Sequence, residues 1–323
     1  MVLILANKWD ITCDFVVREL RRRGHRFLRL NTEDLVSERA TVVLPELRLC
    51  VSKGGSIFDL TREVGVIWNR RPGKPFDDVP RVERPSVATQ QFVNDQWYSW
   101  LESLQILADV VWINHPQVST ALESKIRQLR LASLTGFSVP KTVVSNDPDA
   151  VRHLLEECGG RLIAKALYSP LIEEPDQDFF IFTNEITDVG ANEDSAISLS
   201  PCIFQEAVVP KIDYRITVIG DTVLPVRIES ADGSPVDLDW RTKKEGLKFC
   251  PCTLPPEIER LCRSYVQQSG LAFGAIDLAE HNGQFFFLEI NPNGEWGWLQ
   301  MPNGIPIAET LCEFMIGNDF KDG

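Results

Sequence analysis

Residues 273–298 read FGAIDLAEHNGQFFFLEINPNGEWGW, and this segment carries the clearest pattern of secondary structure in the last third of the chain. Two apolar runs flank the dipeptide Asn282-Gly283, which is a preferred turn of two-residue β-hairpins. The pattern therefore predicts strands over 273–280 and 284–290, joined by a tight turn.

Three side chains with hard oxygen atoms interrupt this hairpin, namely Asp277, Glu289 and Asn291. The tight turn can bring Asp277 and Glu289 to one side of the strand pair. Glu289 and Asn291 are two positions apart in an extended run, so they share a face. Such oxygens suit Mg²⁺, which prefers carboxylates, phosphates and water. An exposed polar face is the alternative, but apolar neighbours make an uncompensated Glu289 costly. We therefore expect a magnesium site.

Upstream, charged residues recur inside predicted apolar strands. Asp213 and Arg215 share one face of a strand over 213–219, and Arg227 belongs to the next strand, over 222–229. These charges indicate either a polar site on the sheet or an ordinary ladder of cross-strand ion pairs.

Two lysines stand out in the middle of the chain. Lys165 lies in the apolar strand predicted over 162–166, where a lysine marks a sheet edge or contact with an anion. Lys125 lies in a helix predicted over 119–133 and ended by Gly136. Spacing alone does not distinguish these lysines from solvated ones.

The pattern of the N-terminal part predicts a βαβ unit with a parallel sheet. Within some thirty residues it contains a strand over 2–6, a helix ending near Gly24 and a strand over 26–30. A long helix is expected over 85–108. The order along the chain is α/β, then α+β. We expect domains at 1–115, 116–202 and 203–323, the last mostly antiparallel sheet.

Composition limits the possible partners. The chain has 323 residues, of which 44% are hydrophobic and 24% charged, as in soluble globular proteins. Its formal charge of -13 disfavours nucleic acids and anionic membranes as partners. No apolar run reaches the roughly 18 residues of a membrane span.

The eight Cys are scattered along the chain without CxxC spacing. This pattern indicates reduced thiols rather than a zinc site, and hence a cytoplasmic protein.

Taken together, these residues resemble the ATP-grasp superfamily over about residues 114–315, and the N-terminal unit looks like the domain that precedes that fold. The pattern is Lys125, Lys165, a strand over 205–208, Asp213-x-Arg215 and Asp277…Glu289-x-Asn291. A closer resemblance is to the microviridin-type maturases, or graspetide synthetases. It is carried by Trp68-Asn69-Arg70-Arg71-Pro72, by Ile181-Phe182-Thr183-Asn184 and by residues 288–298.

The resemblance implies a reaction and its partners. ATP with Mg²⁺ would phosphorylate an Asp or Glu side chain of a precursor peptide, which has a leader and an acidic core. A Thr or Ser hydroxyl, or a Lys amine, of the same peptide would then form an ω-ester or ω-amide ring. The resemblance also suggests a homodimer.

Roles for single residues follow from the same resemblance. Phosphates of ATP would be held by Lys125 and Lys165, and adenine by Gln205, Glu206, Ala207 and Val208, mostly through the backbone. Asp213 would touch the ribose or orient Arg215. Arg215 and Arg227 would neutralise the acyl phosphate and the incoming carboxylate. Asp277, Glu289 and Asn291 would bind Mg²⁺. Peptide contacts are expected at Arg70, Arg71, Arg241 and Lys243, although a solvated loop is the alternative for the last two.

One segment departs from the superfamily pattern. Residues 168–178 contain no glycine and four acidic residues, so cradling of phosphates by that loop is in doubt. Two other functions share the same ATP site. One is a ligase that adds free glutamate to a protein or peptide, and the other is a non-catalytic ATP-binding regulator.

Overall fold

The structure is a computed structural model that describes residues 1–168, 171–173, 178–180, 183–231, 238, 240 and 246–321, except the side chains of 171–173 and 178–180. Contacts divide the chain into two compact units. Unit 1 comprises Met1–Pro116, Leu271–Phe273 and Asn293–Gly323, and unit 2 comprises Gln117–Gly270 and Gly274–Pro292. The three-domain division stays a prediction, although the last residues of its third part belong to unit 1.

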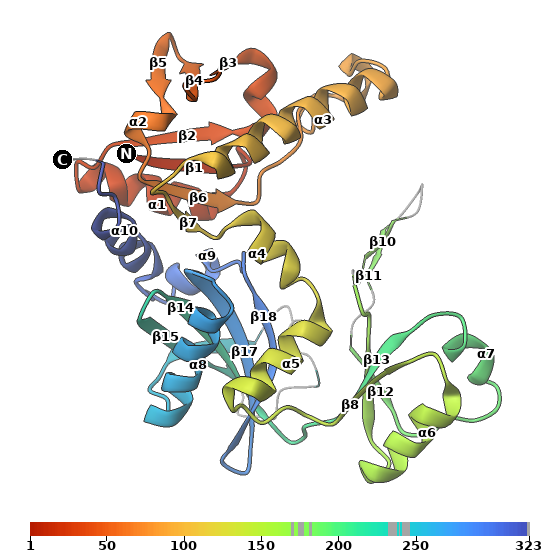
Figure 1. Cartoon of the computed structure of the whole chain (residues 1–323). Coiled ribbons are helices and arrows are strands. Elements are labelled where there is room, and N and C mark those ends of the chain that lie inside the picture. The colour runs from red at the N-terminus through yellow and green to blue at the C-terminus, as the bar shows by residue number, and fades with distance from the viewer. Residues whose placement is uncertain are drawn as a thin grey trace. The chain divides into compact units, whose positions relative to one another are not determined.

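Unit 1 is built on a parallel four-stranded sheet in the order β2-β1-β6-β7 (Figure 1). Its elements are β1 (Val2–Ala6), α1 (Ile11–Arg22), β2 (Phe27–Asn31), β6 (Val66–Arg70) and β7 (Val111–Ile113). Every residue of β1 is buried, as a central strand of a parallel sheet requires. Asp10 caps α1 by accepting a hydrogen bond from the Cys13 N–H. The predicted βαβ unit is confirmed.

Smaller elements complete unit 1. They are η1 (Thr32–Ser37), the antiparallel strands β3 (Arg39–Val43), β4 (Arg48–Lys53) and β5 (Ser56–Asp59), then α2 (Leu60–Glu63), η2 (Arg81–Glu83), α3 (Val87–Ser103), η3 (Leu104–Ile106), α9 (Gly297–Gln300) and α10 (Ile307–Gly317). The long helix expected over 85–108 is shorter at both ends, and its last turn is a 3₁₀-helix. α3 buries no residue fully, while α10 packs against α1.

Unit 2 begins with two helices where one was predicted over 119–133. They are α4 (Pro116–Ala121) and α5 (Lys125–Thr135). The break is at Ser124, whose hydroxyl accepts a hydrogen bond from the Arg127 N–H and so caps α5. Gly136 ends α5 with a positive φ of 108°, as predicted. Lys125 is therefore the first residue of a new helix.

A small antiparallel sheet follows, in the order β12-β9-β13-β8. Its elements are β8 (Thr142–Ser145), α6 (Pro148–Glu157), β9 (Leu162–Lys165), β12 (Asn184–Ile186), α7 (Asp194–Ile197) and β13 (Cys202–Glu206), and a separate pair is formed by β10 (Leu171–Glu173) and β11 (Asp178–Phe180). One face of the small sheet, with Leu162 and Phe204, packs against Val151 and Leu154 of α6. The opposite face is therefore available for function.

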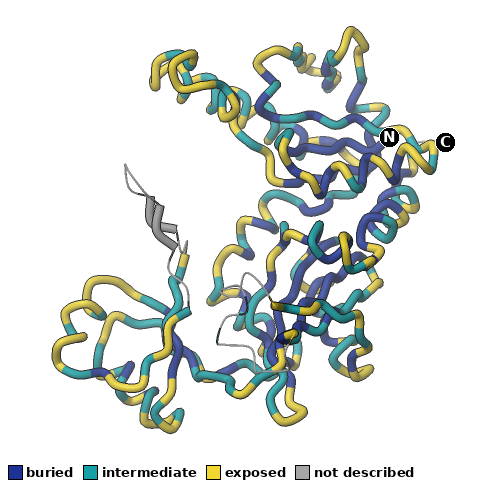
Figure 2. Tube along the Cα trace, turned by 180° about the vertical axis from the view of Figure 1, so that it is seen from behind, coloured by how far each residue is buried: buried dark blue, intermediate teal, exposed yellow. Residues whose placement is uncertain are grey.

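The largest sheet has the order β16-β15-β14-β17-β18. Its elements are β14 (Ile212–Ile219), β15 (Thr222–Ser230), β16 (Leu247–Pro251), α8 (Pro256–Gln268), β17 (Phe273–His281) and β18 (Gln284–Asn291). Helices α5 and α8 pack on one face, where Tyr265 stacks near Phe137 and Phe287. Figure 2 shows the buried residues concentrated along such central strands. Among the described residues, no helix has both the length and the apolar composition to cross a membrane.

Candidate functional site

The β17–β18 hairpin places the three predicted metal ligands. Its turn is Asn282-Gly283, where both residues have positive φ, and pairing is regular from His281↔Gln284 to Leu278↔Phe287. Beyond that point the register shifts, so that Asp277 pairs with Glu289 rather than with Leu288. A regular register would put Glu289 on the opposite face of the sheet. The bulge therefore brings both carboxylates to one face.

Arg215 joins this face from the neighbouring strand β14. Its Nη1 donates hydrogen bonds of 3.0 Å to both carboxylate oxygens of Asp277. Arg215 is 7% exposed and Asp277 is 6% exposed, so this is a buried ion pair. Asp213, two residues before Arg215, shares its face and forms a second buried ion pair with Lys211. The same sheet face thus carries two buried ion pairs, Arg215–Asp277 and Lys211–Asp213.

Arg227 lies elsewhere. The register pairs Arg215 with Val226 and Tyr214 with Arg227. Because directly paired residues share a face, Arg227 lies on the face of Tyr214, opposite to Arg215. There Tyr214 donates a 2.6 Å hydrogen bond to Glu280, and burial together with that bond raises the pKa of the tyrosine well above its ordinary value. The register does not support the expected joint role of Arg215 and Arg227.

A second set of predicted residues meets on the small sheet. Lys165 pairs with Ile203, and Gln205 pairs with Ile163 and Thr142, so they share the face opposite to α6. The Lys165 ammonium donates to Gln205 Oε1 at 3.1 Å, and Gln205 Nε2 donates to Thr142 Oγ1 at 2.9 Å. Lys125 Nζ donates to the carbonyl of Ala166 at 3.2 Å. The structure therefore brings both predicted phosphate-binding lysines to the end of β9.

The expected adenine-binding stretch lies where β13 ends. Glu206 is the last residue of β13, and its N–H donates to the Lys141 carbonyl at 2.8 Å. The Ala207 N–H donates to the Arg161 carbonyl at 3.3 Å, and Val208 follows outside the strand. These backbone N–H groups already have partners, so adenine contacts through them stay a prediction.

The face with Asp277 and Glu289 fits a divalent cation by its donor chemistry, since carboxylate and amide oxygens are the ligands that Mg²⁺ prefers. Two orphaned polar atoms on the same face also indicate a polar ligand. Arg215 Nε and Thr217 Oγ1 are buried and have no hydrogen-bond partner among the described residues. In the described part of the chain, no group of three or more His, Cys, Asp or Glu side chains is placed to hold a metal ion. The predicted set, however, combines two carboxylates with an amide.

Arg70 and Arg71 have different surroundings in unit 1. Arg70 is 1% exposed, and its guanidinium contacts Asp10 at 2.9 Å, Thr12 at 3.0 Å and Glu295 at 2.8 Å. A peptide contact through Arg70 is not supported, because this side chain is buried and contacts Asp10, Thr12 and Glu295. Arg71 is partly exposed and also binds Glu295, and burial lowers the pKa of its guanidinium. It remains available for a peptide contact.

Other expected positions lie outside the described residues. These are Arg241 and Lys243, residues 181 and 182 of the Ile-Phe-Thr-Asn motif, and 169–170 and 174–177 of the glycine-free segment. Their roles stay predictions.

The structure also identifies site residues that sequence reasoning missed. Lys211 lies two residues before its partner Asp213. Because residues two apart in a strand share a face, the sequence could have indicated this ion pair. Gln128 gave no such signal. It is buried in α5, donates to the Leu122 carbonyl at 2.6 Å, and accepts a 3.0 Å hydrogen bond from the Ile290 N–H. Ile290 lies between Glu289 and Asn291, so Gln128 holds the strand that carries two predicted metal ligands.

No family model matches the chain, and no curated protein matches it. Solved structures do match. The macrocyclase MdnC from Microcystis aeruginosa MRC, bound with precursor peptide MdnA, is 20% identical with a TM-score of 0.83, over 98% of this chain and 99% of that one. A RiPP-associated ATP-grasp ligase from Chryseobacterium gregarium, in complex with ADP and a leader and core peptide, is 22% identical with a TM-score of 0.84, over 100% and 98%.

A further neighbour is the ATP-grasp ligase PsnB, complexed with a phosphomimetic variant of a minimal precursor, Mg and ADP. It is 21% identical with a TM-score of 0.74, over 98% of each chain. At such identities the likeness shows the fold. The predicted ATP-grasp fold, with a βαβ unit before it, is confirmed along nearly the whole chain.

Proposed function

We propose that this protein is an ATP-dependent ligase that closes rings within a ribosomally made precursor peptide. The observation that carries the proposal is the likeness over nearly the whole chain to ATP-grasp proteins whose structures contain precursor peptides. The paired carboxylates beside a buried arginine on one face of the large sheet support it.

The proposed reaction has two steps. A side-chain carboxylate of the peptide attacks the γ-phosphorus of ATP, which forms an acyl phosphate and releases ADP. A Thr or Ser hydroxyl, or a Lys amine, of the same peptide then attacks the acyl carbon and releases phosphate. The linkage is an ω-ester or ω-amide, and each one removes the mass of one water from the peptide. Catalysis of this kind depends mainly on positioning and neutralisation of charge.

The roles divide between the two sheets of unit 2. Lys125 and Lys165 hold phosphates of ATP, and the strand end after Gln205 binds adenine. Asp277, Glu289 and Asn291 hold Mg²⁺, which supplies charge neutralisation for the phosphates. Arg215 neutralises the acyl phosphate, and Asp213, which forms an ion pair with Lys211, touches the ribose or orients Arg215. Arg227 is left out of this centre because of its register.

The cell compartment and the oligomeric state belong to the same proposal. A cytoplasmic location is proposed from the sequence, whose eight scattered cysteines lack CxxC spacing. A homodimer is proposed from the resemblance, and light scattering of the purified protein would measure it.

The test is mass spectrometry of a candidate precursor peptide, chosen from short Asp/Glu-rich reading frames next to this gene, after incubation with the protein, ATP and Mg²⁺. We expect loss of one water per linkage with the native protein and with Glu229→Gln, a matched control on the opposite sheet face. Glu289→Gln should lose the activity by about 100-fold or more. Addition of glutamate masses would instead support the amino-acid ligase, and an unmodified peptide would contradict ring closure.

A further inference from the structure

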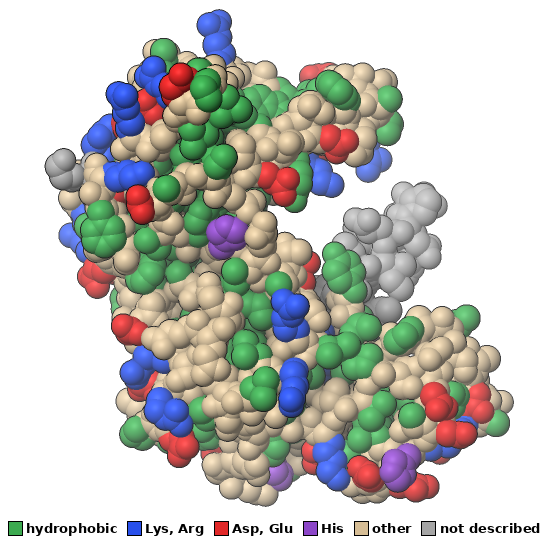
Figure 3. Space-filling view, in the orientation of Figure 1, with side chains coloured by type: hydrophobic (Ala, Val, Ile, Leu, Met, Phe, Trp, Pro, Cys, Tyr) green, Lys and Arg blue, Asp and Glu red, His purple; other side chains and the backbone are tan. Residues whose placement is uncertain are grey.

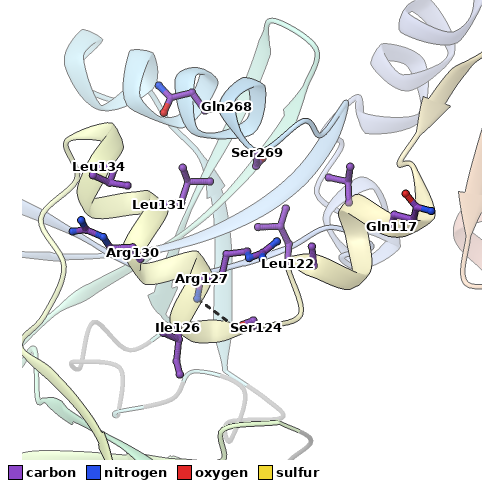
Figure 4. A pocket seen from close by; sticks show the side chains of 12 residues that line it. Gln117, Leu122, Ser124, Ile126, Arg127, Arg130, Leu131, Leu134, Gln268 and Ser269 are labelled. Atoms are coloured by element: carbon purple, nitrogen blue, oxygen red, sulfur yellow. Dashed lines mark hydrogen bonds between the residues drawn. The ribbon is translucent and has the colours of Figure 1, made fainter.

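On the face of the molecule drawn in Figure 3, basic and acidic side chains are interspersed with hydrophobic ones. Helices α4, α5 and α8 of unit 2 border a groove of about 750 Å³, which is shown in Figure 4. The residues that line this groove include no Cys, His, Asp or Glu, so it offers no strong metal ligand. A more specific chemistry is found at the edge of the large sheet, where two thiols lie close together.

These thiols are Cys250 and Cys252, on and directly after the strand β16. The sheet order begins with β16, so this is the outermost strand of the large sheet. The Cys252 N–H donates to the Pro225 carbonyl at 3.2 Å, which continues the pairing with β15 one residue beyond the end of β16. Residues two apart in an extended run share a face, so both thiols lie on one side of the sheet. Both cysteines are half-buried.

The spacing of the two thiols suits a bridging metal ion better than a disulfide. A strand rises about 3.3 Å per residue, which puts the Cβ atoms of residues two apart about 6–7 Å from each other. A disulfide needs Cβ atoms that are about 3.5–4.5 Å apart. A metal ion that joins two thiolates in line holds the sulfur atoms about 4–5 Å apart, because each metal–sulfur bond is about 2.3 Å long. Sulfur atoms that lean toward each other from such Cβ positions span this distance.

Arg227 lies directly across from Cys250, and the proposed reaction does not use it. The register pairs these two residues, so their side chains share a face. Arg227 Nη2 forms an ion pair with Glu229, while Arg227 Nε is buried and has no hydrogen-bond partner among the described residues. Burial raises the pKa of the Cys252 thiol, and the charge of Arg227 opposes this shift. An N–H donor without a partner is therefore available to hydrogen-bond to a metal-bound sulfur.

The donor set selects a soft metal ion that needs few ligands. Thiolates favour Cu⁺ and Zn²⁺. Zn²⁺ takes four ligands, but all Cys and His of the chain belong to the part that the structure describes, and no three His, Cys, Asp or Glu there are placed to hold a metal ion together. Cu⁺ is a soft d¹⁰ ion that two thiolates satisfy. Two thiolates with one Cu⁺ have a net charge of about -1, which a neighbouring guanidinium offsets.

We propose that Cys250 and Cys252 bind a single Cu⁺ ion, with Arg227 as the hydrogen-bond donor and counter-charge. Binding displaces the two thiol protons and leaves the copper in its reduced state. Because Arg227 lies on the sheet face opposite to Arg215 and Asp277, this site is separate from the predicted Mg²⁺ ligands. The inference goes beyond the proposed function and does not depend on it.

The experiment titrates the reduced, full-length protein with Cu⁺ without oxygen, in competition with the chromophoric chelator bathocuproine disulfonate. We expect the native protein to withdraw one equivalent of Cu⁺ from the chelator. Cys250→Ser and Cys252→Ser should each weaken binding by about 100-fold or more, because the chelate is lost. Arg227→Gln should weaken it by about tenfold. The double variant Cys50→Ser/Cys158→Ser, which alters two half-buried cysteines of other elements, is the matched control and should bind Cu⁺ like the native protein.

X-ray absorption at the copper edge of the loaded native protein gives a second readout that does not depend on how the variants fold. Two sulfur neighbours and no other ligand are expected, and a third sulfur, nitrogen or oxygen ligand would overturn the two-coordinate site. The inference also fails if the native protein takes no Cu⁺ from the chelator, or if both single serine variants bind it as tightly as the control. Peptide joining is measured separately, so none of these results bears on the proposed function.

Discussion

At the scale of single residues, the polar face of the large sheet depends on how its buried charges are paired. Arg215 and Asp277 are both almost inaccessible to solvent, and each is the charged partner of the other. A buried ion pair of this kind contributes modestly as a pair, but removal of one partner leaves an uncompensated charge. The pair therefore makes the face sensitive to single substitutions.

We expect Asp277→Ala to lower the free energy of unfolding by about 3–5 kcal/mol, because Arg215 would remain buried without its partner. The double variant Asp277→Ala/Arg215→Ala should recover part of this loss, since it removes both charges. Urea unfolding followed by circular dichroism measures both. Asp221→Ala, at an exposed turn, is the control, and an equal loss in that variant would refute the prediction.

At the scale of elements, the bulge in β17–β18 decides the site. The turn at Asn282-Gly283 could be predicted from the sequence. The bulge, in which Leu288 is the additional residue of β18, could not. Without the shift, Glu289 would oppose Ile276 on the other face. The face is then held by α5, because Gln128 accepts a hydrogen bond from the Ile290 N–H.

Gln128→Met should keep the volume of this side chain but remove the hydrogen bond to Ile290. The buried N–H then lacks a partner, at a cost of about 1–3 kcal/mol in unfolding free energy. Because the strand with Glu289 and Asn291 is loosened, we also expect a higher Mg²⁺ concentration for half-maximal peptide joining. Gln267→Met, at an exposed position of α8, is the control. An unchanged Mg²⁺ titration would show that Gln128 is only structural.

Helix α1 carries a pH-dependent contact. Hydrogen bonds from Arg22 and Arg23 to Glu19 lower the pKa of its carboxyl from 4.5 to about 2. A carboxyl whose pKa is lower in the folded than in the unfolded protein stabilises the fold at pH values above its unfolded pKa. This stabilisation is lost as the pH falls toward 2.

We therefore expect Glu19→Gln to lose about 1 kcal/mol of unfolding free energy at pH 7, a modest value because Arg22 is mostly exposed to solvent. The loss should shrink steadily below pH 4.5, the ordinary pKa of this carboxyl. Urea unfolding at pH 7 and pH 3 measures the difference, with exposed Glu46→Gln as the control. A difference that stays constant with pH would contradict this assignment.

At the scale of the whole molecule, the chain returns to unit 1 after its last strand. The Arg70 guanidinium binds the Gly294 carbonyl at 3.3 Å and Glu295 at 2.8 Å, and Trp296 lies buried near Phe15. These contacts join residues more than 200 positions apart in sequence. Residues after 292 are thus part of the fold of the N-terminal unit.

We expect Arg70→Lys to destabilise unit 1 by about 3–5 kcal/mol, because an ammonium cannot reach Asp10, Thr12 and Glu295 together. Differential scanning calorimetry should show the loss as a lower Tm. Arg26→Lys, at an exposed ion pair with Glu63, should change the Tm little. Equal Tm values for the two variants would show that Arg70 is not needed for the fold.

Features that depend on neighbouring residues could be predicted from the sequence alone. The sequence predicted the βαβ unit, the Asn-Gly hairpin, the glycine end of α5 and the order of motifs of the ATP-grasp fold, because alternation, turns and caps act over a few residues. The sheet face on which each charged side chain lies, and its partners there, became known from the three-dimensional structure. The structure places Arg227 on the face opposite to Arg215, buries Arg70 within unit 1, begins a new helix at Lys125, and contains the bulge at Leu288 that keeps Glu289 on the face of Asp277. Register and burial depend on contacts between strands distant in sequence, and a one-residue shift reverses every side chain.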